Sequence, residues 1–111
     1  MKKLANRKAL ITGASSGIGK AVAFSFAEEG AKVAINYPDM AQKENADSIV
    51  SKIIDEGGQA IAIQADVSKA DENASMVEQF FDQFGDIDIL VNNAGIGDTS
   101  TVDEMSIDAW D

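Results

Sequence analysis

Four short apolar runs alternate along the chain with longer segments in which apolar residues recur at helical spacing. The runs are nearly continuous, which is typical of parallel strands that are covered on both faces. They lie at about 8–12, 32–36, 60–65 and 87–92. Each is separated from the next by enough residues for a crossover helix. The pattern predicts an α/β fold with about four parallel strands.

The connecting segments carry the signals of amphipathic helices. We expect the first helix over about 18–29, before Gly30, and the end of the second at Gly57-Gly58. The apolar stripe of the second helix is Ile49, Val50, Ile53 and Ile54. The stripe of the third, which we expect to pack against the sheet, is Met76, Val77, Phe80, Phe81 and Phe84. Before it, the segment Ser68-Lys69-Ala70-Asp71 predicts a capping box.

A glycine-rich turn, Thr12-Gly13-Ala14-Ser15-Ser16-Gly17-Ile18-Gly19, stands between the first strand and the first helix. A helix N-terminus offers unpaired N–H groups and partial positive charge to an anion, and glycine lets a diphosphate approach the backbone. A Walker loop is excluded because Ala14 and Ala21 stand where it needs a glycine and a hydroxyl. The G-x-G-x-x-G spacing of long-chain dehydrogenases is also missing. The turn predicts a phosphate site, with a purely structural glycine turn as the alternative.

Two further polar motifs follow strands. Asp66-Val67 follows the third apolar run, and Asn92-Asn93-Ala94-Gly95 follows the fourth. The carboxyl ends of parallel strands share one edge of a sheet, and ligands bind at that edge. Taken singly, Asp66 also fits a turn cap and the asparagines fit a strand end. Together with the glycine turn, the motifs predict one ligand-binding edge.

The turn written TGxxxGxG, with Asp66-Val67 and the segment NNAG at 92–95, resembles the short-chain dehydrogenase/reductase family. The resemblance implies a Rossmann-like open sheet of strand order 3-2-1-4, helices on both faces and a crevice between strands 1 and 4. It implies that Asp66 accepts a hydrogen bond from the adenine amino group and that NNAG steadies the sheet and lines the cofactor pocket. The cofactor-binding residues that it implies are Gly13, Ser15, Ser16, Gly17, Ile18, Gly19, Tyr37, Asp66, Val67, Asn93, Ala94 and Gly95.

The same resemblance implies an oxidoreductase that transfers hydride between NAD or NADP and an alcohol or carbonyl. Within the family, the sequence is most similar to the glucose-dehydrogenase and 3-oxoacyl-reductase types. Ser16 and Pro38 occupy the two positions that commonly carry Arg for NADP, and Tyr37 occupies the position that is acidic in many NAD enzymes. Because neither Arg nor Lys stands there, the sequence favours NAD.

The catalytic residues that the family uses, a Ser and a Tyr-x-x-x-Lys pair, are not found in the chain. The single tyrosine, Tyr37, is followed four residues on by Ala41. We therefore expect residues 1–111 to be one dinucleotide-binding domain, incomplete at its C-terminus and without turnover of its own. Ser106 fits the N-cap of a further helix, and the run 87–92 would be an exposed edge that favours homo-oligomers. The alternative is a non-catalytic nucleotide-binding or self-assembling module.

Composition narrows the possible partners. The net charge is −10, and residues 70–111 carry eleven acidic residues and neither Lys nor Arg. Such a surface repels nucleic acid and anionic membranes, so we expect neither as a partner. With neither Cys nor His in the chain, disulfides, zinc sites and a Ser-His-Asp triad are excluded within it. The first apolar stretch is too short for a signal peptide or a membrane span, which predicts a cytoplasmic protein.

Overall fold

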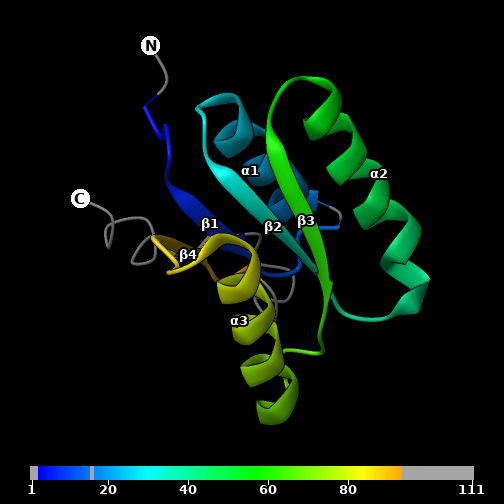
Figure 1. The fold of residues 1–111 in the computed structure, drawn as a ribbon. Coiled ribbons are helices and arrows are strands. Elements are labelled where there is room, and N and C mark those ends of the chain that lie inside the picture. Colours follow the sequence, from blue (N-terminus) through cyan, green and yellow to red (C-terminus); the bar gives the residue numbers. More distant parts are fainter. Residues whose placement is uncertain (1–2, 16, 94–111) are drawn as a thin grey trace.

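The structure, a computed structural model, describes residues 3–15 and 17–93. These residues form a parallel sheet with crossover helices (Figure 1). In chain order the elements are β1 (Lys8–Ile11), α1 (Gly17–Glu28), β2 (Lys32–Tyr37), the 3-10 helix η1 (Met40–Gln42), α2 (Lys43–Asp55), β3 (Gln59–Gln64), α3 (Ala70–Phe84) and β4 (Ile89–Val91). The four predicted strands and the three predicted helices are confirmed. The further helix expected from Ser106 lies outside the described residues.

The strands are ordered β3-β2-β1-β4, and every neighbouring pair is parallel. In the register of the sheet, Leu10 of β1 lies between Ala34 of β2 and Leu90 of β4. The predicted α/β fold and its strand order are thus confirmed. The order reverses at β1, which places the carboxyl ends of β1 and β4 side by side.

Helices α1 and α2 lie on one face of the sheet and α3 on the other (Figure 1). Side chains alternate along each strand, so that neighbouring residues enter different core layers. The layer under α1 and α2 contains Ala9, Ile11, Val33, Ile35, Ile89 and Val91 from the strands, with Ala23, Ala46, Ile49 and Ile53 from the helices. The smaller layer under α3 contains Leu10, Ala34, Ile63, Ala65, Met76 and Phe80.

The predicted packing of the α3 stripe was wrong at two positions. Met76 and Phe80 are buried, but Val77 is 47% exposed and Phe81 is 58% exposed. In α2, Ile54 is likewise 52% exposed. Adjacent residues on a helix point in directions about 100° apart, so that both rarely face the same sheet. The outer residue of each pair therefore faces away from the core.

The predicted capping box before α3 was also wrong. The residue before the helix is Lys69, whose side chain makes no capping hydrogen bond. Ser68 Oγ instead donates to Asp66 Oδ1 at 2.6 Å, because that carboxylate two residues back is a nearer partner. The start of α3 is joined to the end of β3 in another way, since Glu72 Oε1 accepts a hydrogen bond from the backbone N–H of Asp66 at 2.8 Å.

Candidate functional site

The polar motifs converge at the carboxyl edge of the sheet. The glycine turn follows β1, Asp66 follows β3, and Asn93 follows β4. The structure therefore brings together the described members of the predicted set, namely Gly13, Ser15, Gly17, Ile18, Gly19, Tyr37, Asp66, Val67 and Asn93, at the ends of neighbouring strands. Ser16, Ala94 and Gly95 lie outside the described residues.

Hydrogen bonds join the turn after β1 to the residues after β4. The hydroxyl of Thr12 accepts a hydrogen bond from the backbone N–H of Asn93 at 2.9 Å. The backbone N–H of Thr12 donates to the carbonyl of Val91 at 3.0 Å. In return, Asn93 Nδ2 donates to the carbonyl of Gly13 at 3.1 Å. Asn93 thus holds the glycine turn in place, which agrees with the steadying role that the resemblance implies.

Gly19 is required by the close packing of α1 on this turn. A Cβ at Gly19 would lie 2.6 Å from the carbonyl oxygen of Gly13 and 2.7 Å from Asn93 Nδ2. Backbone atoms cannot move aside as a flexible side chain can. The first turn of α1 therefore approaches the strand ends at a distance that only glycine permits.

Gly17, in contrast to Gly19, borders open space. Its φ is +61°, in the left-handed region, and a Cβ placed there would meet nothing within 4 Å. Gly17 also begins α1, where the backbone N–H groups of the first turn have no acceptor within the helix. The open side of the turn thus combines free space with unpaired donors and the positive end of a helix dipole. This arrangement fits a diphosphate.

A further residue, Asn36, was missed by the sequence analysis. It is 1% exposed, and its Oδ1 accepts a hydrogen bond from the backbone N–H of Gly13 at 3.0 Å. Its Nδ2 lies 3.3 Å from the carbonyl of Ile63 and 3.1 Å from that of Ala65. One amide therefore joins the glycine turn to the ends of β2 and β3. The sequence did contain a signal for this role, because a polar residue stands inside an otherwise apolar run. An amide buried there needs hydrogen-bond partners, since an unpaired one would be costly.

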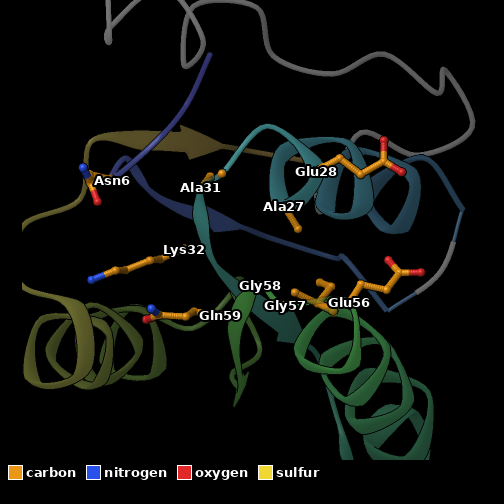
Figure 2. Close-up of a pocket in the computed structure, with 11 residues that line it drawn as sticks. Asn6, Ala27, Glu28, Ala31, Lys32, Glu56, Gly57, Gly58 and Gln59 are labelled. Atoms are coloured by element: carbon orange, nitrogen blue, oxygen red, sulfur yellow. The ribbon is translucent and has the colours of Figure 1, made fainter. Parts of the chain in front are cut away.

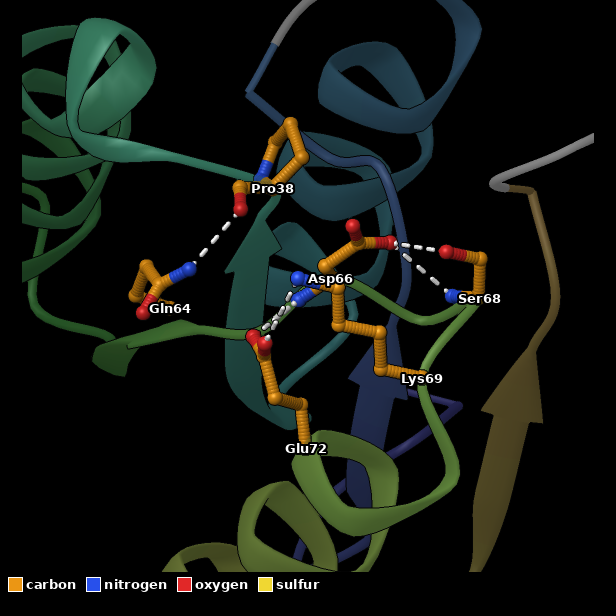
Figure 3. Close-up of polar contacts among 6 residues, drawn as sticks. All are labelled: Pro38, Gln64, Asp66, Ser68, Lys69 and Glu72. Atoms are coloured by element: carbon orange, nitrogen blue, oxygen red, sulfur yellow. Dashed lines mark hydrogen bonds and ion pairs between the residues drawn. The ribbon is translucent and has the colours of Figure 1, made fainter.

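Asp66 is held by its neighbours in a defined orientation (Figure 3). Its Oδ1 accepts hydrogen bonds from the backbone N–H of Ser68 at 3.0 Å and from the Ser68 hydroxyl at 2.6 Å. These bonds lower the pKa of the Asp66 carboxyl below its ordinary value. The group therefore stays ionised near neutral pH and acts only as an acceptor, which suits an amino group as its partner.

Tyr37 ends β2 at this edge, but its side chain turns inward. It is 6% exposed and belongs to the core layer that includes Ala46 and Ile49. The next residue, Pro38, accepts a hydrogen bond from Gln64 Nε2 at 2.8 Å (Figure 3). Contact between Tyr37 and an adenosine ribose stays a prediction.

Two cavities lie at different parts of the sheet. One, of about 510 Å³, lies between α3, β1 and β4 and is lined by Thr12, Val67 and Asn92 among others, at the predicted crevice. The other, of about 250 Å³, lies at the amino ends of β2 and β3. Figure 2 shows Lys32 and Gln59 on one side of this second cavity, with Glu28 and Glu56 on the other. It contains none of the predicted site residues.

In residues 3–15 and 17–93, no group of three or more His, Cys, Asp or Glu residues could hold a metal ion. Within the same residues, no helix is both long and apolar enough to cross a membrane.

Comparison with known proteins gives matches over nearly the whole chain. Residues 7–111 match the family model described as short chain dehydrogenase. The 3-oxoacyl-[acyl-carrier-protein] reductase FabG of Staphylococcus epidermidis is 44% identical over 106 residues, which cover 96% of this chain and 43% of that protein. A 3-oxoacyl-[acyl-carrier-protein] reductase of Synechocystis sp. is 44% identical over 110 residues, covering 99% of this chain and 44% of that protein.

Solved structures agree with these matches. A dehydrogenase/reductase from Sinorhizobium meliloti has a TM-score of 0.78 and 44% identity, and the match covers 84% of this chain and 36% of that one. A blue fluorescent protein from a metagenomic library, solved in complex with NADPH, has a TM-score of 0.80 and 40% identity, over 84% of this chain and 38% of that one. This chain spans less than half the length of these relatives. The family match, the strand order and the motifs at the strand ends agree, and the chain belongs to the short-chain dehydrogenase family.

Proposed function

We propose that this chain is the nicotinamide-dinucleotide-binding part of an oxidoreductase that acts on an alcohol or a carbonyl group. The observation that carries the proposal is the open glycine turn. Gly17 has a left-handed φ with free space beside it, while Gly19 and Asn93 close the other side. The matched relatives named as 3-oxoacyl reductases support a carbonyl or alcohol as the substrate class.

The roles proposed for the residues follow from this geometry. The N–H groups at the start of α1 bind the diphosphate, and Asn36 and Asn93 hold the turn in place. Asp66 accepts a hydrogen bond from the adenine amino group, and Val67 lies beside it at the crevice. When bound, the cofactor would supply the hydride. Gly95 and Ala94, outside the described residues, are proposed to line the same pocket.

The chain is proposed to bind cofactor without turning it over. Proton transfer in this reaction needs an acid or base near the substrate. Tyr37 cannot supply one with a Lys partner, because Ala41 stands four residues on and the Tyr37 side chain is buried in the core. The same observation favours the second candidate function, a nucleotide-binding or self-assembling module without catalysis. Hydride-transfer assays on the chain with alcohols and carbonyls distinguish a stand-alone enzyme from a chain that only binds the cofactor. We expect no turnover, and measurable turnover would contradict this part of the proposal.

Calorimetric titration with NADH tests the site itself. Gly17→Val places a branched side chain on the diphosphate approach, and we expect it to weaken binding at least about tenfold. Asp66→Ala removes one hydrogen bond of on the order of 1 kcal/mol, and we expect about a fivefold loss. Gly57→Val is the matched control, because Gly57 also has a left-handed φ of +94° with open space beside it, at the opposite edge of the sheet. If both site variants bind NADH as the wild type does, the assignment is wrong.

A further inference from the structure

The segment between β3 and α3 is anchored to the first turn of α3 by two side chains. Glu72 Oε1 accepts a hydrogen bond from the backbone N–H of Asp66 at 2.8 Å. Asn73 Nδ2 donates a hydrogen bond to the backbone carbonyl of Val67 at 2.6 Å. Two consecutive residues of the helix thus hold two consecutive residues of the segment, one through its backbone donor and the other through its backbone acceptor.

Burial separates these two side chains from their neighbours on the helix. Glu72 and Asn73 are half-buried, whereas Asp71 before them and Ala74 after them are exposed. The two oxygens of Glu72 have different contacts, since Oε1 accepts the backbone hydrogen bond and Oε2 lies 3.8 Å from Lys69 Nζ (Figure 3). The pair therefore faces the segment after β3, while the residues on either side face solvent.

The helix is a rigid support for this segment. Further along α3, Met76 is 3% exposed and Phe80 is fully buried, so that the helix is fixed to the sheet. Ser68, which binds the Asp66 carboxylate, is exposed and belongs to the same segment as that carboxylate. Ser68 therefore fixes the carboxylate relative to the segment, whereas the two side chains of the first helical turn fix the segment relative to the sheet.

These contacts leave one oxygen of the Asp66 carboxylate for a ligand. Both Ser68 hydrogen bonds go to Oδ1, and none from the described residues goes to Oδ2. We propose that Glu72 and Asn73 are positioning residues, which hold Asp66 so that Oδ2 meets the amino group of adenine. They thereby determine how strongly the chain prefers adenine to a base without that amino group, because a binding group must be held close to its productive position. This inference rests on the proposed function.

The inference concerns the adenine, which NAD and NADP have in common, and so it applies to either cofactor. The NADPH complex of the blue fluorescent protein gives no support to the preference for NAD that we expected from the sequence. The test therefore uses whichever of NADH and NADPH the chain binds more tightly.

Parallel fluorescence titrations with this cofactor and with its hypoxanthine analogue test the inference. The analogue carries the same fluorescent nicotinamide and the same diphosphate, but an oxygen replaces the amino group of the base. A carboxylate can only accept hydrogen bonds, so that it gains nothing from that oxygen. We expect the wild type to bind the adenine cofactor about fivefold more tightly, which is the effect of one hydrogen bond.

The variants separate positioning from a general loss of structure. Glu72→Ala removes the acceptor, and Asn73→Asp replaces the donor to Val67 by an acceptor of nearly the same size, with a charge that suits the start of a helix. Each should lower the preference for adenine to less than about twofold. Glu72→Gln keeps an oxygen that accepts the hydrogen bond and should retain the preference. Asp71→Ala, which removes an exposed carboxylate from the same helical turn, is the control and should also retain it.

A variant that keeps the full preference, in Glu72→Ala or in Asn73→Asp, would overturn the positioning role of that residue and leave the proposed function intact. Equal weakening of both ligands would overturn the inference as well, because it indicates a structural role only. If the wild type bound the two ligands alike, both the inference and the adenine contact of Asp66 would be wrong, while the diphosphate site would stand. A protein that binds neither ligand would contradict the proposed function itself. Thermal unfolding by circular dichroism confirms that a lost preference does not arise from a lost fold.

Discussion

The two faces of the sheet are covered very differently. On one face, α1 and α2 lie over side chains from all four strands, and this layer contains most of the buried residues. On the other, α3 covers a layer of six buried residues, and Leu90 of β4 is 42% exposed beside a cavity of about 510 Å³. In sequence, α2 and α3 carry comparable apolar stripes, although they lie on opposite faces of the sheet. Burial therefore depends on how many helices cover each strand, which no single segment reveals.

The comparison is tested most directly by Ile35→Ala and Leu10→Ala, which remove buried side chains of equal size from opposite faces. We expect Ile35→Ala to lower the free energy of unfolding by about 4 kcal/mol and Leu10→Ala by about 2.5 kcal/mol. The second cost is smaller because Leu10 already borders the cavity under α3. Urea unfolding measures both values, and equal losses would show that the α3 face is packed as well as the other.

A second test compares neighbours within α3. Phe80 is fully buried, and its ring meets that of Phe84 edge to face at 5.4 Å, whereas Phe81 is 58% exposed. We expect Phe80→Ala to cost about 3 kcal/mol and Phe81→Ala less than about 1 kcal/mol. The same unfolding assay applies. A large loss in Phe81→Ala would mean that this side chain is covered in solution.

The smallest expected effect on stability comes from Leu90→Lys, which alters the exposed side of the edge strand. We expect a change below about 0.5 kcal/mol in unfolding free energy. We expect a larger effect on association between chains. Exposed apolar edge strands pair with other chains, and a lysine on the strand opposes such pairing. If copies of the chain associate through β4, the variant should raise their dissociation constant at least about tenfold, as measured by analytical ultracentrifugation.

Ile54→Lys serves as the control for that measurement. Ile54 is 52% exposed, similar to Leu90, but it lies on α2, which packs against β3 and β2 at the other side of the sheet from β4. The substitution should leave association unchanged. A wild-type chain that remains monomeric at high concentration would contradict the prediction of association through this strand.

The fold and the binding edge were largely predictable because each depends on local signals. The apolar runs gave the strands, the spacing between them required crossovers, and each of the motifs at Gly13, Asp66 and Asn93 directly follows a strand. Parallel strands with crossover connections then place all three motifs on one edge, whatever the details of packing.

The parts that were not predictable depend on contacts between distant segments. Ser68 has the right spacing for a capping box, but Asp66 competes for its hydroxyl. Val77 and Phe81 have helical spacing, but the width of the contact surface decides which residues it covers. The role of Asn36 depends on three backbone groups that come from β3 and from the turn after β1. In each case the residue can be identified in the sequence, but the group that it contacts is determined by the fold.

The hydrogen bonds of Asn36 also affect how the glycine turn moves. The amide proton of Gly13 is shielded by a side chain that is itself bonded to the carbonyls of Ile63 and Ala65. Its exchange with solvent therefore requires the turn to move away from a side chain that is anchored to the end of β3. A ligand at the start of α1 meets a turn that is already ordered on one side, and little conformational entropy is lost there on binding.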